Sequence, residues 1–207
     1  MSLSVDFLQK VKVLYQGFLQ FDATQTDRLK RYRNIEPESA QYLAMLIRIQ
    51  QSQQILEIGT STGYSTLWLA DAASVTGGQV TTLEIEADRT AQARGYAADF
   101  HLLDRINFHV CDALDFLQHN QDVYDFILLD AERHAYLSYW PYLQGMLKKQ
   151  SSVLIVDNVI SHAAEVKDFI RQVKQDARYI SMTLPIGAGL FIVTLRDINV
   201  PDANSVI

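Results

Sequence analysis

The sequence has one cysteine and no long apolar run. Because Cys111 is the only cysteine among 207 residues, the chain cannot form an internal disulfide or a cysteine-based zinc site. No apolar stretch approaches the roughly 18 residues that a membrane span requires. The first residues also lack the basic start and apolar run of a secretory signal. These absences predict a cytoplasmic protein that does not contact a membrane.

Positive charge is also scarce. The chain has 18 Lys and Arg residues against 24 Asp and Glu residues, a formal charge of −6. A protein that binds nucleic acid mainly through phosphates needs a clustered basic surface, so this balance disfavours that role without excluding an RNA substrate. With 48% apolar residues and no repeat, we expect one domain over residues 1–207. Its parts would be N-terminal helices and a closing loop (1–50), a cofactor-binding core (51–195) and a partly frayed tail (196–207).

Apolar spacing predicts an α/β fold. Two helical patterns, near residues 4–19 and 40–47, precede the first strand, and short apolar runs then alternate with helical patterns. Runs such as residues 126–129 are apolar on both faces, so the sheet needs helices on both sides. The last two runs predict a hairpin that adds an antiparallel strand. The predicted strands are 55–58, 80–83, 106–110, 126–129, 153–156, 179–184 and 190–195, and the predicted helices between them are 65–73, 89–100, 113–118, 135–148 and 163–175.

The first two strands end in residues that suit a cofactor. Ligands of such sheets bind beyond the carboxyl ends of the strands. Gly59 and Gly63 would let the backbone approach a ligand at a helix N-terminus, and Glu84 would accept hydrogen bonds from ribose hydroxyls. These features favour an adenosine-containing cofactor. The alternative is that the glycines only turn the chain and Glu84 caps the next helix.

The spacing in this loop distinguishes between cofactors. A dinucleotide fingerprint has a glycine at the middle position, where Ser61 stands here, so NAD is disfavoured. Glu57, two residues before Gly59, suits a cofactor with a cationic end, such as the amino-acid part of S-adenosylmethionine.

Three oxygen-bearing side chains follow the fourth and fifth strands. Asp130, Asp157 and Asn158 would form an oxygen-only site suited to a hard divalent cation such as Mg²⁺. The alternative is that both aspartates are helix N-caps, which are common after strands. Capping does not explain the asparagine.

The segment from Ile55 to Ala70 resembles the cofactor motif of the cation-dependent, S-adenosylmethionine-dependent O-methyltransferases, the family that contains catechol and caffeoyl-CoA O-methyltransferases. Residues 83–85, 128–136, 155–159 and 184–190 resemble further motifs of this family in the same order. The resemblance covers roughly residues 35–195 and implies a Rossmann-like class I methyltransferase fold with seven strands, the last antiparallel. Residues 35–41 resemble the loop that closes over cofactor and substrate, with Ala40 where glycine is usual.

The resemblance also implies site residues and chemistry. The cation would be Mg²⁺, or Mn²⁺ or Ca²⁺, and it would coordinate both oxygens of a small aromatic diol. The resemblance also implies a homodimer, because relatives commonly form homodimers. The implied cation ligands are Asp130, Asp157 and Asn158, the catalytic residues are Arg133 and Asp130, and the residues that bind S-adenosylmethionine are Glu57, Gly59, Thr60, Gly63, Tyr64, Ser65, Glu84, Asp112, Ala113 and Asp130.

One position departs from the family. Arg133 stands where a lysine commonly serves as general base, and arginine stays charged at ordinary pH. Three accounts are open: the cation alone acidifies the hydroxyl, His134 or His162 takes the proton, or the chemistry is altered or lost. We favour the first, with Arg133 supplying positive charge. Alternative functions are O-methylation of a hydroxylated uridine in tRNA and cofactor binding without turnover.

Overall fold

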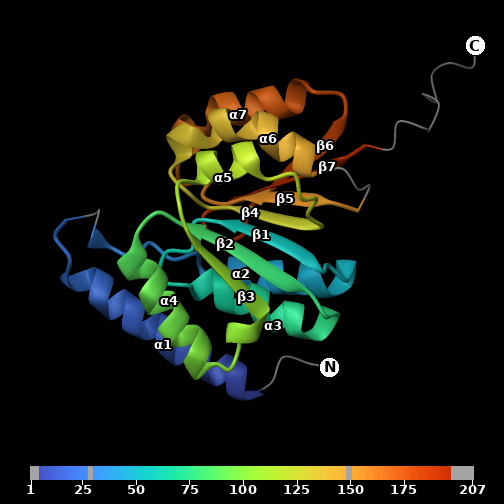
Figure 1. Cartoon of the computed structure of the whole chain (residues 1–207). Helices are drawn as coiled ribbons and strands as arrows, with labels where there is room; N and C mark the ends of the chain where they lie inside the picture. The colour runs from blue at the N-terminus through green and yellow to red at the C-terminus, as the bar shows by residue number, and fades with distance from the viewer. Residues whose placement is uncertain (1–4, 28–29, 148–150, 197–207) are drawn as a thin grey trace, which may run out of the picture.

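A mixed sheet of seven strands lies between two layers of helices (Figure 1). The computed structural model describes residues 5–27, 30–147 and 151–196, so the predicted frayed tail lies almost wholly outside them. The strand order is β3-β2-β1-β4-β5-β7-β6, with β7 antiparallel to both of its neighbours. This confirms the Rossmann-like class I architecture. The elements are α1 (Val5–Thr24), α2 (Pro37–Gln50), β1 (Gln54–Ile58), α3 (Tyr64–Thr76), β2 (Gln79–Glu84), α4 (Ala87–Asp99), η2 (Leu103–Arg105), β3 (Ile106–Val110), α5 (Ala113–His119), β4 (Phe126–Leu129), η3 (Arg133–Ala135), α6 (Tyr136–Met146), β5 (Val153–Val156), α7 (Ala163–Gln175), β6 (Tyr179–Leu184) and β7 (Leu190–Leu195).

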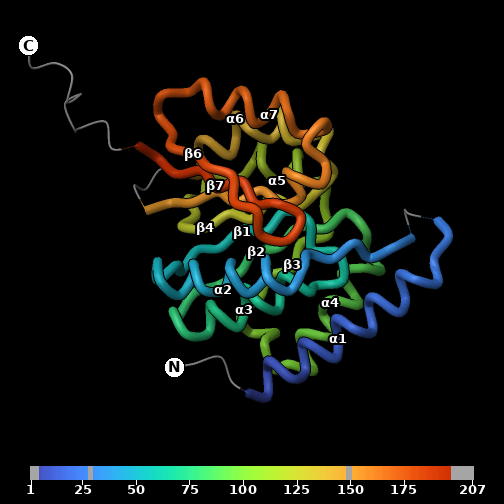
Figure 2. Tube along the Cα trace, turned by 180° about the vertical axis from the view of Figure 1, so that it is seen from behind, coloured from blue at the N-terminus to red at the C-terminus, as the bar shows by residue number. Residues whose placement is uncertain are grey.

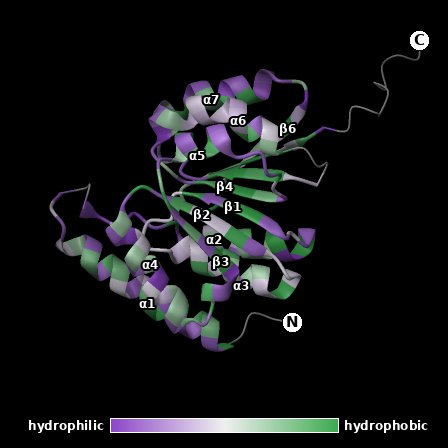
Figure 3. Ribbon diagram, viewed as in Figure 1, coloured by the Kyte–Doolittle hydropathy of each residue, from purple (hydrophilic) through white to green (hydrophobic). Residues whose placement is uncertain are grey.

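Both faces of the sheet are apolar and covered. Along β4, Phe126 and Leu128 join the core formed with α1 to α4, whereas Ile127 and Leu129 join the core formed with α5 to α7. This alternation follows from the two-residue period of a strand. Figure 3 shows the strands as the most hydrophobic part of the chain, with more polar helices outside. The apolar runs in the sequence therefore predicted a sheet covered on both sides correctly.

Helix α1 lies outside α3 and α4 and is held there by aromatic contacts (Figure 2). Phe7 makes edge contacts with Trp68 and Phe100, with ring centroids 5.2 and 5.6 Å apart. The helix is longer than its predicted end near residue 19. Phe21 stacks on Tyr32 at 4.1 Å, and this tertiary contact favours the extra turn. None of the helices in the described ranges is both long and apolar enough to cross a membrane.

The segment predicted as a closing loop is mostly helical. Residues 37–41 form the first turns of α2, and only Ile35 and Glu36 of that segment precede the helix. Pro37 is the first residue of the helix, a position whose N–H would have no acceptor within the helix, so the lack of an N–H in proline costs no hydrogen bond there. The loop of this region is instead the chain before it, from residue 30 to 36.

Candidate active site

A cavity of about 720 Å³ opens beyond the carboxyl ends of the central parallel strands. It lies where the strand order changes direction, between the loops that follow β1 and β4. Ligands of open α/β sheets bind at such a point. Of the site residues predicted from the sequence, those that line it are Gly59, Ser65, Glu84, Asp112, Ala113, Asp130, Arg133 and Asn158.

The glycines of the loop after β1 are required by close packing within the protein. Gly59 has a φ of 107°, and a Cβ there would lie 2.8 Å from the Asp130 carbonyl carbon. Gly63 has a φ of 86°, and its Cβ would lie 2.8 Å from the Cβ of Ala93 on α4. Both positions favour glycine without a ligand. The structural reason for Gly63 is the approach of α3 to α4, although Gly59 also lines the cavity.

Glu84 holds the loop after β1 against the end of β2. One carboxylate oxygen accepts a hydrogen bond from the Ser61 N–H at 2.8 Å. The other oxygen accepts from the N–H groups of Ile85 and Glu86 at 3.0 and 3.1 Å. These contacts do not cap α4, because its capping position is Glu86. The capping alternative is therefore wrong for Glu84, and its carboxylate faces the cavity with a fixed orientation.

Glu57 is fully buried beneath the loop and does not line the cavity. Its Oε2 accepts hydrogen bonds from Thr66 Oγ1 at 2.5 Å and from Thr82 Oγ1 at 2.6 Å. Its Oε1 is buried and has no hydrogen-bond partner among the described residues. Burial raises the pKa of Glu57 to about 7, against an ordinary value of 4.5, although the three side-chain hydroxyls near it act in the opposite direction. The predicted cofactor residues Thr60, Gly63 and Tyr64 are likewise buried and outside the cavity lining.

Asp130, Asp157 and Asn158 converge at the ends of β4 and β5. Asn158 Nδ2 lies 3.0 Å from Asp130 Oδ1 and 3.0 Å from Asp157 Oδ2. The second oxygen of Asp157 is buried and has no hydrogen-bond partner among the described residues. Burial raises the pKa of both carboxyls, and the charge of Asp130 raises the pKa of Asp157 further. A half-buried carboxyl, Asp130, and a fully buried one, Asp157, are thus held close together, and the positive charge of Arg133 acts on both.

The helix-capping alternative is wrong for both aspartates. The capping positions of η3 and α7, the helices that follow β4 and β5, are Glu132 and His162. Asp112 does have a capping role, since its carboxylate accepts from the N–H groups of Leu114 and Asp115 at the start of α5. Asp112 therefore lines the cavity and caps a helix at once.

The donor set fits a divalent cation. A half turn of the Asn158 amide would exchange Nδ2 for Oδ1 and present a third oxygen to the same point as the two carboxylates. Three oxygen ligands, two of them charged, suit Mg²⁺, Mn²⁺ or Ca²⁺. In residues 5–27, 30–147 and 151–196 no group of three or more His, Cys, Asp or Glu side chains is placed to hold a metal, so a zinc-type site is absent there.

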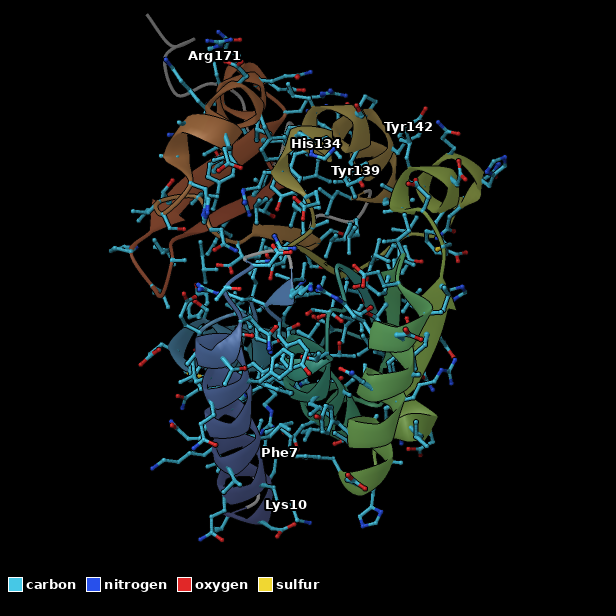
Figure 4. All side chains as sticks on the ribbon, turned by 90° about the vertical axis from the view of Figure 1, so that its left-hand side faces the viewer. Phe7, Lys10, His134, Tyr139, Tyr142 and Arg171 are labelled. Atoms are coloured by element: carbon cyan, nitrogen blue, oxygen red, sulfur yellow. The ribbon has the colours of Figure 1, made fainter. Side chains whose placement is uncertain are left out.

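The side of the cavity formed by the loop after β4 and by α6 carries paired charges and one aromatic side chain. Arg133 Nε donates to Glu165 Oε2 at 2.8 Å, and the Arg133 side chain is only 12% exposed. Arg33 Nη2 forms an ion pair with Glu132 Oε1 at 3.1 Å, and both residues line the cavity. Tyr139, which is labelled in Figure 4, lines the cavity from α6, and His134 lines it as well. The sequence alone could not separate Tyr139 from its buried neighbours Tyr136 and Trp140.

Two features of this side of the cavity could not be predicted from the sequence. Glu36 lines the cavity, and its charge raises the pKa of both Asp130 and Asp157. The Arg33–Glu132 ion pair joins residues 99 positions apart. Pro37 in the sequence predicts the start of a helix and therefore a capping position for Glu36. No local pattern indicates that the Glu36 side chain lies beside the cavity.

Comparison with known proteins gives a consistent result. A family profile described as O-methyltransferase matches residues 19–196. Catechol O-methyltransferase of Niastella koreensis is 28% identical over 131 residues, which cover 61% of this chain and 58% of that protein. A probable caffeoyl-CoA O-methyltransferase of Dictyostelium discoideum is 22% identical over 212 residues, covering 94% and 90%. The crystal structure of a Bacillus cereus O-methyltransferase in complex with SAH is similar with a TM-score of 0.74 and 25% identity, covering 93% and 92%.

Proposed function

Because the chain belongs to the O-methyltransferase family, we propose that it transfers the methyl group of S-adenosylmethionine to one hydroxyl of a small aromatic diol. The proposal includes a divalent cation held by Asp130, Asp157 and Asn158. Its main support is the convergence of these three side chains beside the cavity, with one oxygen of Asp157 buried and unpaired. Relatives named catechol and caffeoyl-CoA O-methyltransferase support a diol acceptor.

The cofactor would lie along the loop after β1. Its ribose hydroxyls would contact Glu84, whose orientation is fixed by three backbone N–H groups. The adenine would lie near Asp112 and Ala113, and the methionine part near Gly59 and Ser65, all of which line the cavity. A relative whose crystal structure is described as a complex with SAH, the demethylated product of such a donor, supports a cofactor of this type.

The buried Glu57, Thr60, Gly63 and Tyr64 would act on this cofactor indirectly, by shaping the loop. Glu57 anchors the start of α3 to β2 through Thr66 and Thr82. We therefore assign Glu57 a positioning role beneath the methionine part of the cofactor.

The chain supplies charge and orientation for the transfer. A bound divalent cation would lower the pKa of a hydroxyl that contacts it and favour the oxyanion as nucleophile. Arg133 keeps its proton, so it adds fixed positive charge and cannot act as base. The pairing of Arg133 with Glu165 holds this charge in place beside Asp130. Tyr139 would contact the aromatic ring of the acceptor.

In the transfer, a lone pair of the acceptor oxygen forms the new bond to the methyl carbon while the bond from that carbon to sulfur breaks. The hydroxyl proton passes to solvent, and the products are a methyl ether and S-adenosylhomocysteine. Holding the two reacting atoms in line is the main contribution of a site of this kind.

Calorimetric titration tests the proposal. S-adenosylmethionine is titrated first, and catechol second, into wild-type protein with Mg²⁺ and again with EDTA. We expect cofactor binding, and catechol binding only with Mg²⁺. Asp157→Asn should lose the catechol response, whereas the matched control Asp168→Asn, on the exposed surface of α7, should keep it. Cofactor binding with no response to catechol or turnover would support the alternative of a cofactor-binding protein without turnover.

An RNA acceptor is the second candidate. Arg31 and Arg33 line the cavity, and Arg28 and Lys30 belong to the same basic run of the sequence. Such a run suits a phosphate backbone. It ranks second because Arg33 already pairs with Glu132. Tight tRNA binding at physiological salt, lost in an Arg31→Ala, Arg33→Ala variant, would move this candidate to first place.

We also propose that the enzyme is a homodimer. Helix α1 exposes Val5 and Val13, at 72% and 73%, beside an apolar groove between α1 and α4. Burying such side chains against a second copy would be favourable. The molar mass from light scattering should be twice that of the chain, and Val13→Asp should reduce it to that of a monomer.

A further inference from the structure

The turn between β6 and β7, residues 185–189, contacts the start of α2, at its capping residue Glu36 and at Ser39 in its first turn. Ser39 Oγ donates to the Ile186 carbonyl at 3.4 Å, and the Ala188 N–H donates to Glu36 Oε2 at 3.3 Å. Figure 2 shows this turn in red next to the light blue chain at the start of α2. Glu36 lines the cavity, so one side of the turn supports a wall of the candidate site.

The other side of the turn supports the chain after Asn158. The Val159 N–H donates to the Gly189 carbonyl at 3.0 Å. The N–H groups of Ile160 and Ser161 both donate to the Ala188 carbonyl at 3.0 Å. Asn158 itself has a φ of 64°, a left-handed conformation that asparagine adopts more readily than most residues with a side chain. The contacts of the turn with the next three residues fix the path of the chain directly after it.

The turn has no room for a side chain on either side. Gly189 has a φ of 99°, and a Cβ there would lie 2.6 Å from the Cβ and 2.7 Å from the nitrogen of Ile160. Gly187 has a φ of 53°, and its Cβ would overlap Ser39 Oγ and lie 2.9 Å from Glu36 Oε2. Each glycine therefore faces one neighbour: Gly189 faces the chain after Asn158, and Gly187 faces the start of α2.

We propose that the turn at residues 185–189 is a positioning element of the site, through which the start of α2, residues 36–39, and the chain after Asn158 are coupled. Strand β5 ends at Val156, so the sheet alone does not fix Asn158. A displacement of the turn moves the Asn158 amide relative to Asp130 and Asp157. The inference rests on the proposed cation site and assigns Gly187 and Gly189 a role in that site without contact to the ion.

The first test compares two glycine variants by Mn²⁺ titration, followed by the electron paramagnetic resonance signal of free Mn²⁺. Gly189→Ala should weaken Mn²⁺ binding by about tenfold or more, the range seen when residues that orient metal ligands are changed. Gly77→Ala is the matched control, because Gly77 also has a positive φ, of 76°, but nothing lies within 4 Å of its Cβ position. Gly77→Ala should lower Tm by about 2–4 °C through its positive φ, and Gly189→Ala should lower it further because its Cβ also overlaps Ile160. Gly189→Ala with the Mn²⁺ affinity of Gly77→Ala would overturn the proposal.

The second test addresses the coupling. Gly187→Ala should also weaken Mn²⁺ binding, although Gly187 contacts none of the three proposed ligands. Adding Ser39→Ala removes the hydroxyl with the closest overlap but leaves the contact with Glu36, so the double variant should regain part of the affinity. Unchanged Mn²⁺ binding in Gly187→Ala would refute the coupling. A wild-type protein that binds no Mn²⁺ would instead refute the proposed cation site, which is a distinguishable result.

Discussion

The buried carboxyl of Glu57 should make the stability of the protein depend on pH. Its pKa of about 7 in the folded state compares with an ordinary value of 4.5, which applies after unfolding. Below pH 4.5 the group is protonated in both states and has no effect. Between these values only the unfolded state releases the proton, so stability falls as pH rises. Above pH 7 Glu57 is ionised in both states, and the loss of stability due to this group is complete.

The magnitude follows from the difference between the two pKa values. At about 1.36 kcal/mol per pKa unit, the gap between 4.5 and about 7 corresponds to about 3 kcal/mol. Between pH 5 and pH 8 about 2.5 kcal/mol of this should be lost. Glu57→Gln keeps an uncharged group of the same shape, with an oxygen that still accepts from Thr66 and Thr82. The variant should therefore gain stability relative to wild type as pH rises.

Urea unfolding of wild type and Glu57→Gln, each in EDTA at pH 5, 6, 7 and 8, measures this difference. The comparison between the two proteins removes the contributions of all other titrating groups. Thr82→Val is a second probe, because it deletes a hydroxyl that stabilises the ionised carboxylate of Glu57. The pKa of Glu57 in the folded state should rise, so the loss of stability should continue to a higher pH than in wild type. Stability curves of wild type and Glu57→Gln that run parallel from pH 5 to pH 8 would refute the reasoning.

Three other perturbations concern buried or paired charges. Asp157→Asn removes one of two adjacent carboxyls, so Mg²⁺ should no longer raise Tm. Without Mg²⁺ the variant should be at least as stable as wild type, because the carboxyl it loses is buried beside the charge of Asp130. A rise in Tm with Mg²⁺ equal to that of wild type would contradict the cation site. Arg133→Lys exchanges a permanent charge for one that titrates, so the rate should gain a pH dependence, and an unchanged rate and profile would show that this position takes no part in the chemistry. Arg48→Ala leaves its partner Asp71, whose side chain is 15% exposed, without a counter-charge and should cost about 2–3 kcal/mol in urea unfolding, which Asp71→Ala in the same chain should partly restore.

The sheet and its layers were predictable from the sequence because they depend on patterns within short segments. The run at 126–129 is apolar at every position, which only a strand covered on both faces requires. The convergence of Asp130 with Asp157 and Asn158 followed from the rule that parallel strands end at one edge. The end of α1 was not predictable, because it depends on the stacking of Phe21 on Tyr32.

The roles of several site residues could not be derived from local patterns. Glu57 stands beside Gly59 in the sequence, yet its carboxylate turns away from the cavity toward Thr66 and Thr82, which belong to other elements. The position of Glu36 depends on a turn about 150 residues later. Contacts between segments that are far apart in the sequence leave no periodic pattern. The sequence therefore predicted which residues lie near the cavity, but it did not predict which of their side chains line it.

The strand order has a consequence for how such an enzyme changes over evolution. After β1 the chain continues into α3 on one side of the sheet, and after β4 it continues into α6 on the other side. The crevice between these diverging connections is thus a product of chain path, whatever side chains border it. Replacement of border residues such as Arg33 or Tyr139 can alter which acceptor fits, while the position of the crevice and the core beneath it are inherited unchanged.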